Sequence, residues 1–411
     1  MITDKLIEEF LDSPIGQNVV SKLKFVGAHG HAPLQELYFH GLTDSAKGFF
    51  LTSLIHSANK PILYLASDIN IALNLYHEIS NLTKLPVFYF PSQEVSPYDQ
   101  IASDVDIISH QTRTLTHLLN EKKPCLIIST GKCLAEKVWN KEDLTKHYFE
   151  INYNTKIDPL DIAKKLVTLG YKKAQMVTTR GEFSIRGDIF DIFQICGEPT
   201  RIEFYGDEIE SIRTYSPTTQ RSQDNTDKVI ITPRYYIVNP SASDLPDKVA
   251  ECCKNDNDLK ELANKEIEQL KTNNYPESIE YYSQLASQKT SSLFDYLPKE
   301  SLLLVDDWEA TAIALENSFQ RNLEIKKELE SNKKIIPLPE LLVWDPEYII
   351  KNLKKYSTSY IERFELFDKS GPESINLCFS PQERFNNQIE KFTEKIKEWI
   401  SLKNKIIIFS D

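Results

Sequence analysis

The chain has 411 residues, of which 41% are hydrophobic, 26% are charged and 10% are aromatic, and its net charge is −12. The length allows roughly two to four domains of ordinary size, and the aromatic content argues against intrinsic disorder. The acidic balance argues against a protein that wraps nucleic acid broadly, and no apolar run is long enough to span a membrane. The acidic N-terminus does not resemble a signal or transit peptide, so we expect a cytoplasmic protein.

The six cysteines form no C-x-x-C pair and have no histidine at the spacing of metal ligands. We therefore expect reduced thiols rather than a disulfide framework or a metal site. The sequence indicates no bound cofactor.

Residues 1–145 alternate between predicted helices and buried strands. Apolar runs at 61–66, 85–90 and 125–129 have the length of strands, and segments with apolar residues at helical spacing separate them. Such alternation predicts an α/β domain with a mostly parallel sheet.

The pattern changes at about residue 146. A helix predicted at Ile162–Leu169 is followed by short alternating runs, with turn residues at Gly197–Pro199 and Gly206–Asp207 between them. We predict a small inserted α+β domain over residues 146–222.

Residues 223–345 are predicted to complete the interrupted sheet. They contain an expected strand at Val229–Pro233, a long charged helix at about Asp247–Lys271 and the apolar strand Leu302–Val305. The predicted fold class is therefore α/β, with a parallel sheet domain that is split in sequence by a small α+β insert.

Residues 346–411 are predicted to be a linker and the start of a further small α/β domain. Gln382–Leu402 has the pattern of an amphipathic helix, and it leads into an apolar strand at Lys405–Phe409. Because a buried type of strand at the end of a chain has nothing after it to complete a sheet, we expect the front part of a longer protein.

A degenerate phosphate-binding loop lies between the first predicted strand and helix. The pattern G-x-x-x-x-G-K-S/T uses glycines for close backbone approach, Lys for the β and γ phosphates and a hydroxyl for Mg²⁺. Here Gly41 and Lys47 have the right types, but Ala46 replaces the second glycine and Gly48 replaces the hydroxyl residue.

The second half of such a site is an apolar strand that ends in two acids. Asp306 and Asp307 follow Leu302–Val305 in this way, with Asp307 where helicases usually carry Glu. Together the two halves predict a helicase-like, P-loop NTPase-type sheet whose nucleotide site no longer functions. We expect no catalytic residues in this chain.

The densest motif spans more than forty residues in three segments: Thr179–Phe193, Glu198–Arg213 and Thr219–Ser222. It resembles the module shared by the nucleotide-excision-repair protein UvrB and the transcription-repair coupling factor (Mfd) family. Agreement with that family extends over almost the whole chain, including Pro61–Asp68, Ser96–Asp99 and Leu293–Leu297.

The choice between the two relatives depends on what UvrB has in addition. UvrB has an intact ATP loop and a long aromatic hairpin that clamps DNA, whereas here Tyr98 is soon followed by a predicted helix. The chain therefore resembles the N-terminal, UvrB-homologous part of the Mfd family. The resemblance implies that contacts with RNA polymerase and double-stranded DNA, and the ATP-driven translocase, lie further along in that family.

The insert has a face suited to binding a protein. In a strand from Arg201 to Tyr205, Ile202 and Phe204 point inward, so Arg201, Glu203 and Tyr205 share the outer face. Arg and Tyr are enriched in binding hot spots. Without the resemblance, a solvated face with cross-strand Arg–Glu pairs is the simpler interpretation.

The resemblance implies that this face binds UvrA. The family's contact positions fall on Arg186, Arg201 and Tyr205, the last of which is commonly Phe in relatives, and Glu203 and Arg180 are weaker candidates. The expected function is a non-catalytic adaptor that recruits UvrA to RNA polymerase stalled at DNA damage. The alternatives are a UvrB-like, damage-verifying ATPase that binds DNA directly, and a structural or autoinhibitory module.

Overall fold

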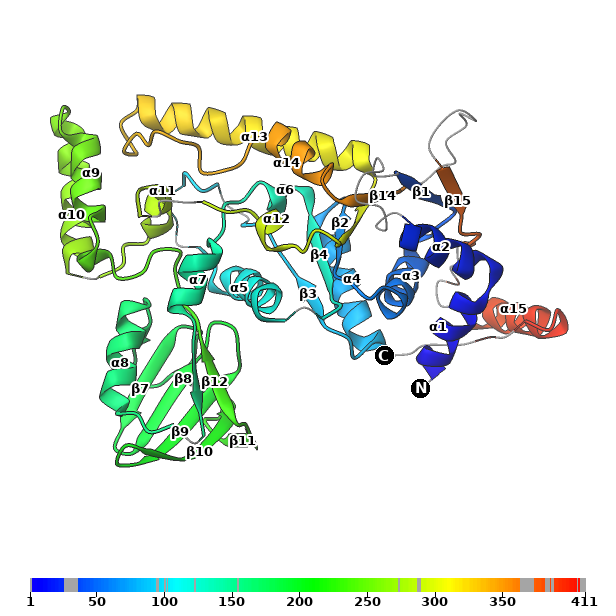
Figure 1. Ribbon diagram of the computed structural model, residues 1–411, viewed down its shortest axis with the longest axis horizontal. Coiled ribbons are helices and arrows are strands. Elements are labelled where there is room, and N and C mark those ends of the chain that lie inside the picture. Colours follow the sequence, from blue (N-terminus) through cyan, green and yellow to red (C-terminus); the bar gives the residue numbers. More distant parts are fainter. Residues whose placement is uncertain are drawn as a thin grey trace.

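The computed structural model describes residues 2–404 except 26–35, 94–95, 100, 102, 122, 154, 273, 287–289, 363–372, 381–384 and 386–387, and it also describes residue 406. Three units are visible in Figure 1: a large sheet with helices on both faces, a smaller sheet below it, and a helical pair at one end. We call them the large unit, the small unit and the helical unit.

The large unit is built on a seven-stranded, parallel sheet, as predicted for the α/β class. Its strands, in spatial order, are β15 (Glu373–Asn376), β1 (Leu37–His40), β14 (Ser357–Ile361), β13 (Leu302–Asp306), β2 (Ile62–Ala66), β4 (Leu126–Thr130) and β3 (Val87–Tyr89). Residues that we expected to begin a further domain therefore supply β14 and β15 to this sheet. The sheet thus contains strands from near both ends of the sequence.

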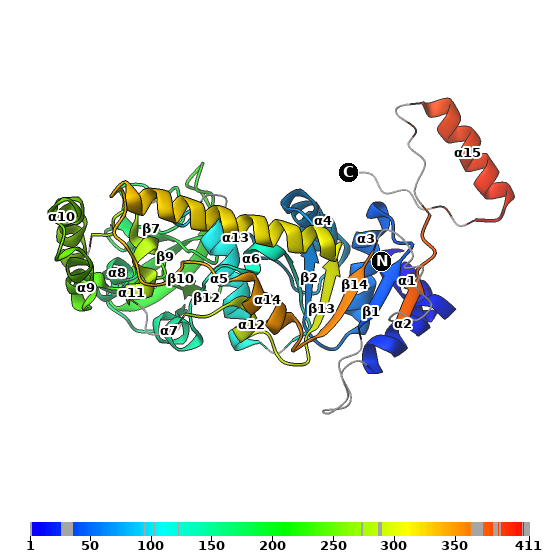
Figure 2. The same ribbon diagram turned by 90° about the horizontal axis from the view of Figure 1, so that it is seen from above.

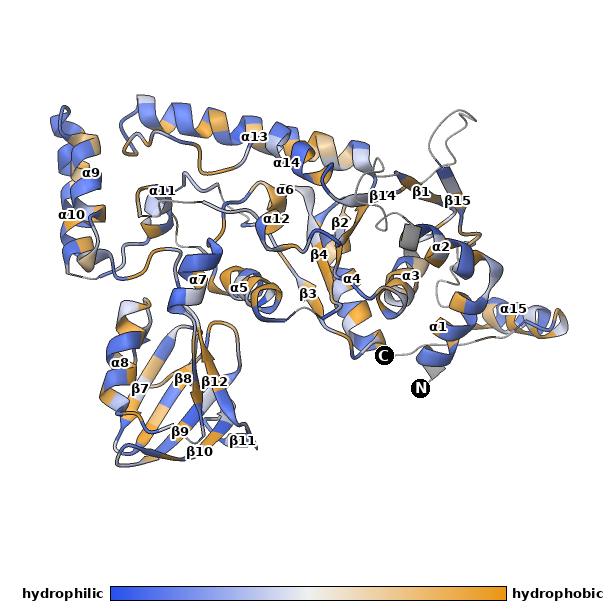
Figure 3. Cartoon of the chain, viewed as in Figure 1, coloured by the Kyte–Doolittle hydropathy of each residue, from blue (hydrophilic) through white to orange (hydrophobic). Residues whose placement is uncertain are grey.

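The central strands β2, β4 and β13 are buried along their whole length because both faces of the sheet are covered. In β13, Leu302 and Leu304 pack into one core while Leu303 and Val305 pack into the other, and all four are fully buried. Figure 3 shows β2 and β4 as mainly hydrophobic, whereas the strands of the small unit alternate.

The helices divide between the two faces. Those whose apolar residues join the core on the face of Leu302 and Leu304 are α2 (Pro14–Phe25), α3 (Asp44–Ser57) and α4 (Ile69–Leu82). Those on the other face are α5 (Val105–Asn120), α6 (Gly131–Leu134), α12 (Leu293–Tyr296), α13 (Trp308–Ser331) and α14 (Pro346–Leu353). The helix α1 (Ile2–Asp12) precedes them, and α13 runs along one side of the molecule (Figure 2).

The small unit is a six-stranded, mostly antiparallel sheet with one covering helix. Its strands, in spatial order, are β11 (Ser222–Asn225), β10 (Glu208–Tyr215), β9 (Pro199–Tyr205), β8 (Ile189–Phe193), β7 (Glu182–Arg186) and β6 (Lys172–Lys173). The helix α8 (Pro159–Thr168) begins with Asp158 as its N-cap and Pro159 in its first turn, and its Ile162 and Leu166 are buried in the core of this unit.

A separate two-stranded sheet completes the small unit. The strand expected at 229–233 is present as β12 (Lys228–Ile231), but it pairs with β5 (Phe149–Asn152) and not with the large sheet. Val229 and Ile231 belong to the small unit's core. The predicted insert, 146–222, thus ended too early, because a buried strand alone does not reveal its partner. The helix α7 (Lys141–His147) leads into β5.

The helical unit contains two helices where one was predicted. They are α9 (Leu245–Cys253) and α10 (Asn257–Lys271), separated where Asp256 accepts hydrogen bonds from the backbone of Asp258 and Leu259 as the N-cap of α10. Short turns complete this unit: η1 (Pro240–Ala242), η2 (Ile279–Tyr282) and α11 (Ser283–Ala286).

The last described helix is α15 (Ile389–Ser401), which Figure 2 shows projecting from the large unit. It covers the second half of the helix predicted at Gln382–Leu402. The strand predicted at Lys405–Phe409 lies almost entirely outside the described residues. Among the helices that the structure describes, none is long and apolar enough to cross a membrane.

Candidate functional site

The outer face of the small sheet carries the side chains that the strand pattern placed there. In β9, Ile202 and Phe204 are buried in the core, whereas Tyr205 is 75% exposed. The register aligns Arg201 with Asp191 on β8 and with Arg213 on β10, so these three side chains share one face. We call Arg186, Arg201, Glu203, Tyr205 and Arg213 the outer face.

Two similar turns bring Arg186 and Tyr205 to the same end of the sheet. Both β7–β8 and β9–β10 are joined by a two-residue Gly-Asp loop, with Arg186 opposite Ile189 and Tyr205 opposite Glu208. The glycines, Gly187 and Gly206, have φ of +60° and +65°, the conformation that tight hairpins require at this position. Because β7 and β9 run in the same direction, the residue before each turn lies at the same edge.

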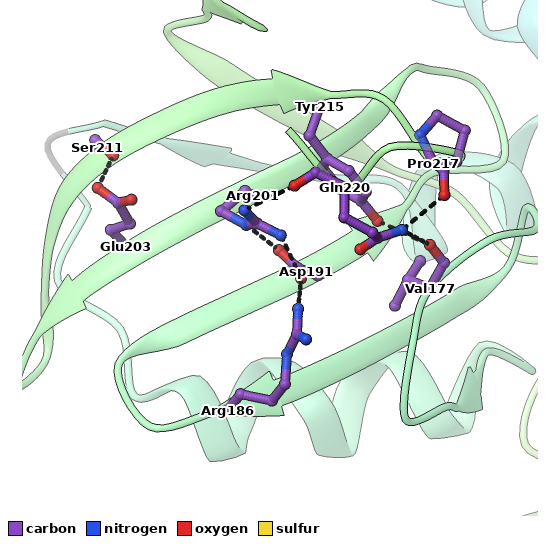
Figure 4. A network of polar contacts seen from close by, with 9 residues as sticks. All are labelled: Val177, Arg186, Asp191, Arg201, Glu203, Ser211, Tyr215, Pro217 and Gln220. Atoms are coloured by element: carbon purple, nitrogen blue, oxygen red, sulfur yellow. Dashed lines mark hydrogen bonds and ion pairs between the residues drawn. The ribbon is translucent and has the colours of Figure 1, made fainter. Parts of the chain in front are cut away.

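A buried carboxylate lies between the two predicted arginines (Figure 4). Asp191 is 0% exposed. Its Oδ1 accepts from Nε of Arg201 at 2.7 Å, and its Oδ2 accepts from the same guanidinium at 3.0 Å and from Arg186 at 2.5 Å. One carboxylate thus holds one arginine in a two-bond fork and a second through a single bond.

Arg201 is largely built into the sheet. Its side chain is 15% exposed, its guanidinium lies 5.1 Å from the centre of the Tyr215 ring, and it donates to the carbonyl of Gln220 at 3.3 Å. The hydrogen bonds to Asp191 raise the pKa of the Arg201 guanidinium. Gln220 in turn donates to the carbonyls of Val177 and Pro217, which fixes the turn before β11.

Arg186 is the more accessible of the two arginines. Its side chain is 49% exposed, and Asp191 is its one ion-pair partner among the described residues. Glu203 lies on β9, two strands from Arg186. It accepts a hydrogen bond from the hydroxyl of Ser211 at 2.6 Å and pairs with Arg213 at 3.7 Å. The outer face therefore combines an exposed cation, an exposed aromatic ring and a carboxylate.

Arg180, one of the two weaker predicted contacts, lies elsewhere. It precedes β7, six residues from Arg186, or about 20 Å along an extended strand. It pairs with Asp106 of α5 at 3.0 Å and donates to the carbonyls of Gln194, Ile195 and Gly197. The pair with Asp106 joins the small unit to the large unit, and together these contacts leave Arg180 apart from the outer face.

The residues of the degenerate nucleotide site meet at the carboxyl end of the large sheet. Lys47 of α3 pairs with Asp306 at the end of β13 at 2.8 Å, and both side chains are buried. Asp307, with φ of +52°, accepts from the backbone of Ala310 and caps α13. Asp306 and Asp307 also help to raise the pKa of the nearby carboxyl of Glu362, although burial is the larger cause.

The glycines of this corner have structural roles. Gly41 has φ of +67°, and Oδ1 of Asn376 lies 2.3 Å from the place where a Cβ would be. The carboxylate of Glu78 lies 2.2 Å from the corresponding place at Gly48, while Ala46 is half-buried in α3. Gly48, which cannot supply a hydroxyl for Mg²⁺, thus makes room for a carboxylate side chain.

A cavity of about 590 Å³ lies where the large and helical units meet, and Glu136 and Glu280 line it. Burial raises the pKa of Glu136 to about 7 and that of Glu280 to about 8. Glu136 accepts from the backbone of Gln93 and the side chain of Gln111, and Glu280 accepts from the backbone of Tyr236. Glu136 thus joins two segments of the large unit, and Glu280 holds the segment that leads into the helical unit.

The sequence analysis missed the residues that hold the outer face together. Asp191 was not among the predicted contact residues. In the described part of the chain, no group of three or more His, Cys, Asp or Glu side chains is suited to a metal ion. Alternate residues of a strand point to opposite faces, so the inward Phe190 and Ile192 were the available signal that Asp191 points outward. Tyr215 and Arg213 come from β10, whose register contains a bulge.

The class of the small unit follows from comparison with known families. Residues 149–236, which include the six-stranded sheet and its outer face, match the UvrB interaction domain. The match begins at β5 and extends beyond β12, in agreement with the shared core of these strands.

The relatives of the whole chain are transcription-repair-coupling factors. The chain is 27% identical over 387 residues to that of Staphylococcus aureus strain MRSA252, covering 90% of this chain and 32% of the relative. It is 25% identical over 405 residues to that of Staphylococcus haemolyticus strain JCSC1435, covering 91% of this chain and 33% of the relative. The chain thus spans about a third of their length and resembles their N-terminal region, which confirms the resemblance predicted from the motifs.

Proposed function

We propose that this chain is a docking module that binds UvrA through the outer face of the small unit, and that it recruits UvrA to RNA polymerase stalled at DNA damage. A role in transcription-repair coupling is supported by the UvrB interaction domain and by the similarity to transcription-repair-coupling factors. The observation that carries the proposal is the placement of Arg186 and Tyr205, both exposed, at one edge of the sheet.

The physical argument is that this edge offers a protein partner both contact area and directed hydrogen bonds. The Tyr205 ring supplies apolar area with few rotatable bonds, and the guanidinium of Arg186 supplies donors in a fixed plane. The buried Asp191 prevents the outer face from becoming a purely positive patch.

We further propose that the chain does not turn over ATP. The Lys47 amine, which would reach the phosphates in an active loop, is bonded to Asp306, and Gly48 provides no hydroxyl for Mg²⁺. Contacts with RNA polymerase and with double-stranded DNA are assigned in this proposal to the two thirds of the relatives that the chain does not match.

The test is a titration of the purified chain with UvrA by calorimetry. We expect saturable binding that Arg186→Ala and Tyr205→Ala each weaken by about 2 kcal/mol, or roughly thirtyfold. Tyr205→Phe should bind nearly as well as the unaltered chain, because the ring supplies most of the contact area.

Lys164→Ala is the matched control, because this lysine is 77% exposed on α8, which covers the opposite face of the sheet. Folding of each variant is verified by circular dichroism. No binding by the folded, unaltered chain would refute the docking proposal, and equal binding by all variants would refute the assigned face.

A further inference from the structure

The buried Asp191 links the two arginines of the outer face. Asp191 lies on β8, between β7, which carries Arg186, and β9, which carries Arg201. The two guanidinium groups approach the same carboxylate from opposite sides, and the carboxylate itself is 0% exposed (Figure 4). A partner protein could not touch Asp191 directly.

Two cations so close to one another repel unless an anion lies between them. Neighbouring strands are separated by about 4.8 Å, so β7 and β9 are about 10 Å apart, and the register places Arg186 two residues from the row of Arg201. Arg201 donates two bonds to Asp191 and Arg186 donates one, which draws both guanidinium groups toward β8.

The two arginines are not equivalent in this arrangement. Arg201 also contacts Tyr215 and Gln220, so its position is fixed from three sides. Arg186 donates to Asp191 through one terminal nitrogen, and its half-exposed guanidinium has further N–H groups for a partner. The position of Arg186 therefore depends mainly on Asp191.

We propose that Asp191 is a positioning residue of the docking face: it contacts no partner, and it orients Arg186 through a direct ion pair while Arg201 anchors the carboxylate. This inference rests on the proposed function of the outer face. In this arrangement a buried charge orients the donors that the partner meets. Because Arg186 is already held in place, its side chain loses less conformational freedom on binding.

The test is a double-mutant cycle measured by titration with UvrA. Asp191→Asn keeps the shape of the side chain and removes its charge, and we expect it to weaken binding about tenfold. In a chain that already carries Arg186→Ala, Asp191→Asn should weaken binding only about twofold or less, because the side chain that it positions is gone.

A merely structural role predicts a different outcome. If Asp191 only stabilises the fold, its substitution should weaken binding by the same factor with and without Arg186, and that result would overturn the inference. Asp161→Asn is the matched control, because Asp161 is an acid on α8, away from the outer face, that makes its ion pair with Lys164. It should show normal additivity with Arg186→Ala.

A second variant keeps the proposal testable if Asp191→Asn does not fold. Arg201→Lys retains the charge but cannot donate the two parallel bonds that anchor the carboxylate, so we expect weaker binding, by about tenfold. Unchanged affinity would overturn the inference. Failure of the unaltered chain to bind UvrA would instead refute the proposed function, so the two failures are distinguishable.

Discussion

Two corners of the molecule bring a cationic side chain against an aspartate, and they differ in what remains exposed. At the end of the large sheet, Lys47 and Asp306 are 2.8 Å apart and both are buried. On the small sheet, Asp191 is equally buried, but the guanidinium of Arg186 is half exposed. An ion pair alone therefore does not indicate a binding site. The small sheet differs from the large one in that the guanidinium of Arg186 is still accessible to a partner.

At the predicted nucleotide site, the two halves come together through contacts within the chain. The Lys47 amine is directed at a carboxylate of its own chain, and the carboxylate of Glu78 lies against Gly48. The outer face keeps its donors toward solvent because β7 and β9 end at open turns, where no atom lies within 4 Å of a Cβ added at Gly187 or Gly206.

The largest effect is expected from breaking the buried pair. Lys47→Ala leaves the carboxylate of Asp306 buried without its cation, so we expect the free energy of unfolding to fall by about 3 kcal/mol. Urea denaturation measures it, with Lys164→Ala as the control on an exposed lysine. A loss below about 0.5 kcal/mol would show that the pair is not buried in solution.

Arg201→Ala is expected to cost less than breaking the buried pair, about 2 kcal/mol of unfolding free energy. The substitution removes two of the three bonds to Asp191 and the packing against Tyr215, but Arg186 remains as a partner for the carboxylate. The same denaturation experiment tests it. A neutral result would mean that Arg201 is a surface residue like Arg186.

The cavity carboxyls predict how stability depends on pH. Burial raises the pKa of Glu280 from 4.5 to about 8, so between these pH values the folded chain keeps a proton that the unfolded chain releases. The free energy of unfolding should therefore fall as the pH rises from about 4.5 to about 8, and Glu136, with its pKa near 7, adds to the same slope.

Glu280→Gln should flatten this slope between pH 5 and pH 8, because the side chain that keeps the extra proton is gone. Thermal melting over this pH range gives the comparison, and Glu203→Gln on the outer face is the control with a half-exposed carboxyl. An unchanged pH profile for Glu280→Gln would contradict the assignment of a raised pKa to this carboxyl.

Arg186→Ala is expected to change stability little, by less than about 1 kcal/mol, because its side chain is half exposed and Asp191 keeps the two bonds from Arg201. A small effect on the free energy of unfolding together with a large effect on UvrA binding would show that Arg186 acts in binding and not in packing. A loss of stability as large as that of Arg201→Ala would erase the distinction between the two arginines.

The smallest effect concerns nucleotide. Because Lys47 is bonded to Asp306, we expect Mg²⁺ and ATP at millimolar concentration to leave the melting temperature unchanged. A rise in melting temperature that disappears in Lys47→Ala would contradict the expectation that the nucleotide site no longer functions, because it would show that the site binds nucleotide through Lys47.

Much of the large unit could be predicted because parallel strands buried on both faces have a distinctive sequence. The apolar runs at 61–66, 125–129 and 302–305 are β2, β4 and β13. What could not be predicted was pairing between distant segments. The run at 229–233 became β12 beside β5, and β15 joined β1 across more than 300 residues, since apolar character does not identify a partner strand.

The outer face was predictable in part for the same reason. Period 2 placed Arg201, Glu203 and Tyr205 together, and the Gly-Asp turns fix the register within each hairpin. The link between β8 and β9 is a longer loop, so the sequence alone could not align Asp191 with Arg201. The residue that joins the two arginines was therefore missed.

The central claim, that UvrA docks on the edge formed by the two Gly-Asp turns, is tested most directly by hydrogen exchange of the chain with and without UvrA. We predict slower exchange at 186–189 and 203–208, with unchanged exchange in α3 beside Lys47. Protection confined to the large unit, with none at either turn, would contradict the account.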